Sequence, residues 1–121
     1  MTRTNASTDD LDAMFDSAAR YFLALAEPTR LRILHIVCQN ELSVNEIVVA
    51  SGLSQSNVSR HLGLMHRMGV LRRRRDGAQV FYTVSDESVT DICRAVCVRV
   101  MSQQVAASGG DAFAGGQRSV Q

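Results

Sequence analysis

The sequence contains no lysine: all 13 of its cationic residues other than histidine are arginines. Arginine pairs with phosphates and guanine edges through two parallel hydrogen bonds, so this composition favours partners of that kind. The sequence also lacks an apolar run near the roughly 20 residues that span a bilayer. Its N-terminal residues, MTRTNASTDDLD, lack the apolar stretch of a signal peptide. We therefore expect a cytoplasmic protein with no membrane partner.

The residue patterns of common catalytic sites are absent as well. The sequence has no phosphate-binding loop and no HExxH-type metal motif, and its glycine-rich segments occur only near the C-terminus. It shows neither a nucleophile paired with a base nor a pair of acidic residues arranged for acid–base catalysis. These absences argue against an enzyme.

The charge is distributed unevenly along the chain. The net charge of the whole sequence is +1, but residues 30–79 carry eight arginines and three acidic residues, a net charge of +5. Residues 1–29 have a net charge of −3 and residues 80–121 a net charge of −1. A localised basic segment is more informative about partners than the overall charge, and it indicates an anionic partner for the middle of the chain.

Four helices are expected before residue 70. Apolar residues at helical spacing predict a helix over residues 8–26, capped by Ser7 or Thr8, and a second over 27–39 with Pro28 in its first turn. The S-x-x-E pattern that starts at Ser43 is a capping box and predicts a short helix that ends near residue 52. Another helix follows over residues 55–68, so these two short helices and their tight turn are typical of a helix-turn-helix.

A hairpin and a long helix are expected after residue 69. The dipeptide Asp76-Gly77 between two strand-like segments, 70–75 and 79–84, is a strong hairpin signal. Helical spacing returns from Asp86, and the Gly-, Ala- and Ser-rich residues after 105 predict a disordered tail. We thus expect a flexible N-terminus (1–8), one domain (9–105) and a disordered tail (106–121). So short a chain has little interior, which makes a homodimer that shares apolar helices plausible.

This element order predicts a mostly α fold with a β-hairpin wing, a winged helix-turn-helix. The sequence also resembles the ArsR/SmtB family of bacterial repressors. The matching segments are ALAEPTRLRIL (24–34), ELSVNEI (41–47), GLSQSNVSRHLGLMHRMGVL (52–71) and DGAQVFYTV (76–84). The resemblance covers about residues 10–105. It implies a homodimer formed by the first and last helices, which binds an inverted-repeat DNA operator and releases it when an effector binds.

The expected DNA-reading residues lie on the helix over 55–68. Val58, Leu62 and Met65 form its inward stripe, so its outward side chains near the N-terminal end are those of Gln55, Ser56, Ser59 and Arg60. Amide, hydroxyl and guanidinium groups suit base edges and phosphates, although a merely solvated polar face has the same composition. His61 lies nearer the apolar stripe and is expected to pack inside.

Four consecutive arginines, Arg72, Arg73, Arg74 and Arg75, occupy the first strand of the expected wing. Strand alternation sends Arg72 and Arg74 to one face and Arg73 and Arg75 to the other, so only one pair can face DNA directly. Phosphate is the natural partner for neighbouring arginines. The alternative is a charged edge strand that only keeps the protein soluble.

The effector has to be inferred from Cys38, Cys93 and Cys97. Ser43 and Asn45 stand where many members of the resembled family have a metal-binding Cys-Val-Cys motif, and residues 86–105 contain no histidine for the zinc site of other members. Dithiol members of that family sense persulfide or oxidants with one cysteine in the second helix and one in the last. The resemblance implies a switch that uses Cys38 and Cys97. Compared with the pattern of that family, Cys38 lies about one turn later and Cys97 about one turn earlier.

Two other roles of the cysteines remain open. Cys93 and Cys97 are four residues apart on one helix face and would form a two-thiolate clip for As(III) or another thiophilic metal ion. All three cysteines would instead be packing residues in a DNA-binding module without an effector, because cysteine is often buried. Our leading expectation is a repressor that thiol modification releases from DNA.

Overall fold

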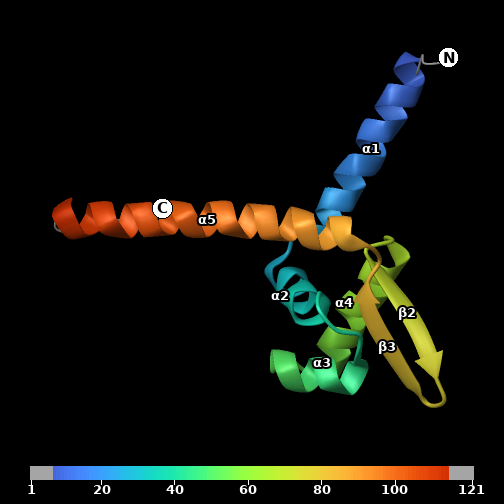
Figure 1. Ribbon diagram of the computed structural model, residues 1–121. Helices are drawn as coiled ribbons and strands as arrows, with labels where there is room; N and C mark the ends of the chain where they lie inside the picture. Colours follow the sequence, from blue (N-terminus) through green and yellow to red (C-terminus); the bar gives the residue numbers. More distant parts are fainter. Residues whose placement is uncertain (1–6, 115–121) are drawn as a thin grey trace. The chain divides into compact units, whose positions relative to one another are not determined.

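The computed structural model describes residues 7–114. It contains five helices and three short strands within that range (Figure 1). The helices are α1 (Thr8–Leu25), α2 (Pro28–Val37), α3 (Val44–Ser51), α4 (Gln55–Arg67) and α5 (Glu87–Ala114). The strands are β1 (Leu42–Ser43), β2 (Leu71–Asp76) and β3 (Gln79–Val84). The predicted mostly α fold with a hairpin wing is confirmed, and the chain divides into two compact units, Met1–Glu87 and Ser88–Gln121.

Side-chain caps fix where the helices of the first unit begin. The Ser7 hydroxyl accepts a hydrogen bond from the Asp10 amide at 3.2 Å, and the Glu27 carboxylate accepts one from the Arg30 amide at 2.8 Å. Such caps satisfy amides that the first turn of a helix leaves without a partner. The predicted cap of α1 is thus confirmed as Ser7, and Thr8 is the first helical residue, so the flexible N-terminus that we expected over residues 1–8 does not include these two residues.

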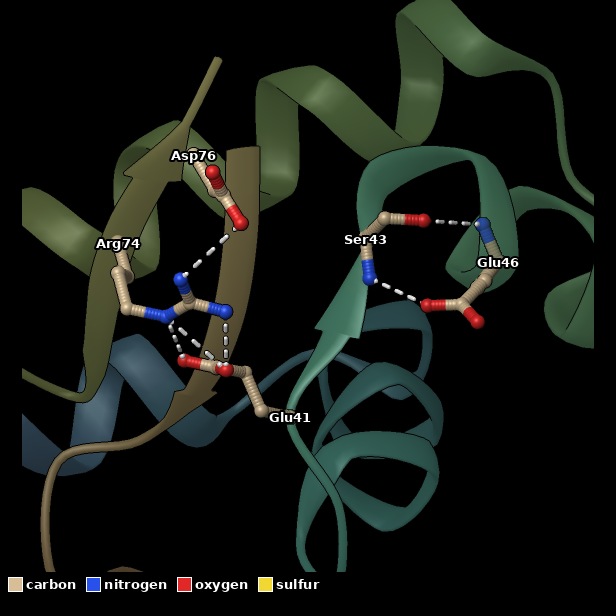
Figure 2. Close-up of polar contacts among 5 residues, drawn as sticks. All are labelled: Glu41, Ser43, Glu46, Arg74 and Asp76. Atoms are coloured by element: carbon tan, nitrogen blue, oxygen red, sulfur yellow. Dashed lines mark hydrogen bonds and ion pairs between the residues drawn. The ribbon is translucent and has the colours of Figure 1, made fainter. Parts of the chain in front are cut away.

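The helix-turn-helix is bounded in the same way. Ser43 and Glu46 form the predicted capping box: the Ser43 hydroxyl accepts from the Glu46 amide at 3.1 Å, and the Glu46 carboxylate accepts from the Ser43 amide at 2.8 Å (Figure 2). The short helix ends at Gly52, whose φ of 72° is left-handed and suits a residue without a β-carbon. The Ser54 hydroxyl then accepts from the Asn57 amide at 3.2 Å and starts α4.

The core of the first unit lies between α2, α3, α4 and one face of the sheet. Its fully buried side chains share an aliphatic or thioether character: Ile33, Val37, Ile47, Val58, Leu62, Met65 and Val70. Leu71 of β2 and Tyr82 of β3 close the core from the sheet side. Burial of these side chains stabilises the packing of α4 and the hairpin against the same core.

The sheet has three strands in the order β1-β3-β2, all antiparallel. The hairpin was predicted, and Gly77 in its turn has a φ of 63°. The strand β1 was not predicted, because two residues are too few to show the alternation of a strand. It places Leu42 opposite Tyr82, so β3 is bonded on both sides.

The helix α5 continues to Ala114, beyond Val105 where we had expected it to end. Over residues 106–114 the predicted disordered tail is therefore helical; residues 115–121 lie outside the described range. Each residue added to an existing helix gains a hydrogen bond without a new nucleation cost, and alanine, frequent here, is the strongest helix former.

Both terminal helices expose large apolar side chains. On α1 these are Leu11, Met14, Phe15, Phe22 and Leu23, and on α5 they are Val96, Val98, Val100, Met101 and Val105. Contiguous apolar surface on a helix usually marks an interaction site. Within residues 7–114, no helix combines the length and apolar character required to cross a membrane.

The capping box yields a first prediction. Replacing Ser43 with alanine removes the acceptor for the Glu46 amide, so the free energy of unfolding should fall by about 1 kcal/mol. Urea denaturation followed by circular dichroism measures this loss. Ser59→Ala, an exposed position inside α4, is the matched control and should leave stability nearly unchanged; equal stability of both variants would rule out a significant cap.

Candidate nucleic-acid interface

The helix α4 has one buried and one exposed face. Val58, Leu62 and Met65 are fully buried, as expected, whereas the four predicted DNA-reading residues are all exposed. These four are Gln55, Ser56, Ser59 and Arg60. They lie in the first half of the helix, where unpaired backbone amides and the helix dipole also favour phosphate.

One residue that orders this face escaped the sequence reasoning. A guanidinium nitrogen of Arg60 donates a hydrogen bond of 2.7 Å to the side-chain carbonyl of Asn57. This contact holds the Arg60 side chain along the first turn of α4 and leaves its other donors for a partner. The spacing of three residues on a helix was the available signal.

His61 is buried on the inner face of α4, with 6% of its surface exposed. Its Nδ1 atom has no hydrogen-bond partner among the described residues, and the same is true of the buried Nε of Arg30 on α2. Burial lowers the pKa of the His61 imidazole; the nearby charges of Arg60 and Arg30 act in the same direction, and Glu27 opposes them. Burial therefore favours the neutral form of the imidazole inside the helix-turn-helix.

The wing separates its four arginines by face. Residues directly opposite each other in an antiparallel pair point to the same side, and the register pairs Arg72 with Thr83 and Arg74 with Phe81. Both arginines of this face are held by the protein itself. Arg72 donates to the backbone carbonyl of Ser85 at 3.3 Å, and Arg74 lies over the Phe81 ring, 4.7 Å from its centroid.

Arg74 also binds a carboxylate that the sequence reasoning did not single out. Its Nε and Nη2 atoms donate to Glu41 at distances of 3.1 and 2.7 Å, and its Nη1 lies 3.8 Å from Asp76 (Figure 2). The hydrogen bonds from Arg74 lower the pKa of the Glu41 carboxyl. Glu41 lies 33 positions before Arg74, so no local spacing could have revealed this pair.

Arg73 and Arg75 point to the other face, which they share with the buried Leu71 and Tyr82. Both arginines are exposed, and neither forms a hydrogen bond or an ion pair with any residue that the structure describes. Unlike Arg72 and Arg74, they are thus held by no such contact, and no described residue compensates their charges.

Known proteins resemble this chain in sequence and in architecture. The profile of the bacterial regulatory protein arsR family matches residues 27–73. The regulator Rv0081 of Mycobacterium tuberculosis is 35% identical, over 78% of this chain and 87% of its own length. The chain belongs to the ArsR family. This ArsR-family chain is accordingly a winged helix-turn-helix DNA-binding transcriptional regulator and not an enzyme.

Two further proteins are similar to this chain. The homodimeric winged helix-turn-helix domain of Mb0332 from Mycobacterium bovis superposes with a TM-score of 0.71 at 30% identity, covering 80% of this chain and 90% of that one. A probable mercury resistance operon repressor of Streptomyces lividans is 42% identical, over 64% of this chain and 62% of its own length.

The three cysteines of this ArsR-family chain differ in their exposure to solvent. Cys38 is half-buried at the C-terminal cap of α2, where its thiol donates to the His35 carbonyl at 3.2 Å. Cys93 is half-buried and Cys97 exposed, one turn apart on α5. Cys38 belongs to the first compact unit and the other two to the second. Across the described range, no three His, Cys, Asp or Glu side chains cluster in a way that could hold a metal ion.

The lowered pKa of His61 gives a pH prediction. The unfolded chain binds the imidazole proton near pH 6.5 and the folded chain only at lower pH, so stability is complete above about pH 6.5 and falls as the pH drops below it. Urea unfolding at pH 7.5 and 5.5 should therefore show a smaller loss for His61→Gln than for the unsubstituted protein. Equal losses would show that His61 is not responsible.

Proposed function

We propose that this chain is a cytoplasmic, homodimeric repressor that binds an inverted-repeat operator and releases it when cysteine thiols are modified. One observation supports the DNA-binding mode above all others. The exposed polar residues in the first half of α4 lie in the same unit as Arg73 and Arg75, whose charges have no partner within the described part of the chain. Double-stranded DNA offers base edges to the former and phosphates to the latter.

The chemistry of the two groups differs. Arg60 suits the O6 and N7 acceptors of guanine, and Gln55 suits the N6 and N7 atoms of adenine, both through paired hydrogen bonds in the major groove. Ser56 and Ser59 donate to a base or a phosphate. Arg73 and Arg75 would contact the backbone without regard to sequence and release condensed cations.

A dimer is supported by the exposed apolar residues of α1 and α5. Such surface is costly in water, and a second copy of the chain would remove it from solvent. The relative from Mycobacterium bovis is described as homodimeric. A two-fold symmetric dimer presents two copies of α4, which is why its operator would be an inverted repeat.

The DNA-binding mode predicts two kinds of mutational effect. Fluorescence anisotropy distinguishes these two effects when it is measured on two DNA duplexes. One is a duplex that the unsubstituted protein selects from a random library, and the other is a scrambled duplex. Arg60→Ala should weaken binding to the selected duplex by roughly 10- to 100-fold and change the scrambled duplex little, because a paired base contact carries about 1–3 kcal/mol of discrimination. Arg73→Ala should weaken both equally and lower the salt slope by about 0.9. Equal losses for Arg60→Ala on both duplexes would contradict base reading.

For the effector, we propose a dithiol switch that joins Cys38 to Cys97. Cys93 and Cys97 are spaced by one helical turn, so their β-carbon vectors run nearly parallel and suit a mutual disulfide poorly. The exposure of Cys97 makes it accessible to a sulfur donor. An organic persulfide RSSH would oxidise the two thiols to a disulfide and leave RSH and hydrogen sulfide, which balances atoms and electrons.

A thiophilic metal ion is the second candidate effector. Cys93 and Cys97 together provide two thiolates to As(III) or a related ion, and a relative is described as a probable repressor of a mercury resistance operon. Two ligands are an incomplete set for a four-coordinate ion such as zinc, so this clip would need further ligands from a second chain. In the third alternative the cysteines only pack and another ligand releases the DNA.

Single cysteine variants distinguish these effectors. With a Cys38–Cys97 switch, an organic polysulfide should release the DNA from the unsubstituted protein and from Cys93→Ser, and dithiothreitol should restore binding. Cys38→Ser and Cys97→Ser should remain bound. With a metal clip, arsenite should release the DNA, and Cys93→Ser should abolish this response while Cys38→Ser keeps it. Unchanged release from the triple serine variant would rule out both thiol proposals.

A further inference from the structure

Arg74 differs from the other three wing arginines in its contacts, because it alone among them forms an ion pair within the described residues. The strand order β1-β3-β2 puts β3 between Arg74 on β2 and Glu41, which immediately precedes β1. The Arg74 side chain lies over the Phe81 ring on β3. Its guanidinium reaches the Glu41 carboxylate (Figure 2). The Arg74–Glu41 ion pair thus bridges β2 and the residue that precedes β1, across β3.

The contacts of this side chain suit arginine in particular. Its planar guanidinium stacks on an aromatic face and meets a carboxylate with a fork of parallel N–H groups, and both interactions restrict its orientation. Glu41 takes two of its nitrogens and Asp76 lies near the third. A DNA phosphate that sought the same donors would have to displace Glu41.

The Glu41 end of the contact is tied to the helix-turn-helix. Glu41 is followed by Leu42, which pairs with Tyr82, and by Ser43, whose hydroxyl caps α3 (Figure 2). The Arg74 end lies in the middle of the β2 strand, beside Arg73 and Arg75. The ion pair therefore connects the start of the helix-turn-helix directly to the strand that carries the uncompensated arginines.

We propose that Glu41 and Arg74 are a positioning pair that fixes the wing relative to the helix-turn-helix, and that Arg74 does not bind phosphate. This proposal rests on the proposed DNA-binding function. It narrows the set of four arginines that we named as candidate DNA contacts: Arg73 and Arg75 bind the backbone, and Arg74 orients the strand that carries them. Arg74 has 52% and Glu41 36% of its side chain exposed, so the pair adds little to overall stability and acts mainly on DNA affinity.

A charge swap separates positioning from phosphate binding. Arg74→Ala breaks the pair, and DNA affinity should fall about fivefold, which lies within the coupling range of residues in one network. The double variant Glu41→Arg, Arg74→Glu restores an ion pair with reversed polarity and keeps the net charge. Because the swap restores the ion pair but not the stacking on Phe81, its affinity should rise above that of Arg74→Ala without reaching that of the unsubstituted protein, and its salt slope should be unchanged. If Arg74 bound phosphate, the glutamate at this position would repel DNA and the salt slope would fall.

Two controls make the outcome specific to positioning. Arg73→Ala in the same assay should lower the salt slope by about 0.9, and reversing Arg73 to glutamate should not be rescued by Glu41→Arg. The urea midpoints of the Arg74→Ala and swapped proteins should match that of the unsubstituted protein. If the substitutions only weakened the fold, these midpoints would fall. A swap that binds no better than Arg74→Ala, or a lowered salt slope, would overturn the positioning pair.

The two proposals fail in different ways. If the unsubstituted protein bound no duplex from the random library, the proposed function would be overturned and the positioning role with it. If it bound with a steep salt dependence but the charge swap gave no rescue, the DNA-binding function would stand and only the role of Glu41 and Arg74 would be rejected.

Discussion

The pairing of β3 with both of its neighbours is the constraint on which the interface depends. Tyr82, buried in the middle of β3, lies opposite Leu42 on one side and Arg73 on the other. Its position fixes which residues of β2 share the face that packs on the helices. A register shift of one residue would exchange the two pairs of arginines and turn Leu71 to solvent. The burial of Leu71 and Tyr82 therefore determines that Arg73 and Arg75 are the two wing arginines without a partner among the described residues.

The recognition helix depends on a similar division. His61 directly follows Arg60, so one side chain is buried in the core while its neighbour is exposed. A charged imidazole at this depth would oppose burial, and the lowered pKa of His61 keeps the inner face neutral. Glu27, which caps α2, is the one acidic group that opposes this shift. The same helix can thus seat firmly on the core and carry a cationic outer face.

The sequence was sufficient for features that depend on neighbours along the chain. The capping box at Ser43, the turn at Gly77 and the alternating faces of α4 each follow from a few adjacent residues, and each was predicted. The strand β1 was missed because its two residues have no period of their own and are ordered by β3. Alternation gave two possible pairs of arginines, but the choice between them required the register. The Glu41–Arg74 contact depends on tertiary structure alone, since the two residues are distant in sequence.

The absence of lysine has a structural reason at position 74 of the wing, where the observed contacts require arginine. A phosphate ligand on an exposed strand can be arginine or lysine, because a point charge is enough to displace condensed cations. The contacts of Arg74 need more than a charge: a flat group to lie over Phe81 and a fork to meet Glu41. A lysine has neither, since its ammonium is compact and strongly hydrated. Within the run of four arginines, position 74 is thus the one at which the geometry requires arginine, while at positions 73 and 75 the charge alone suffices.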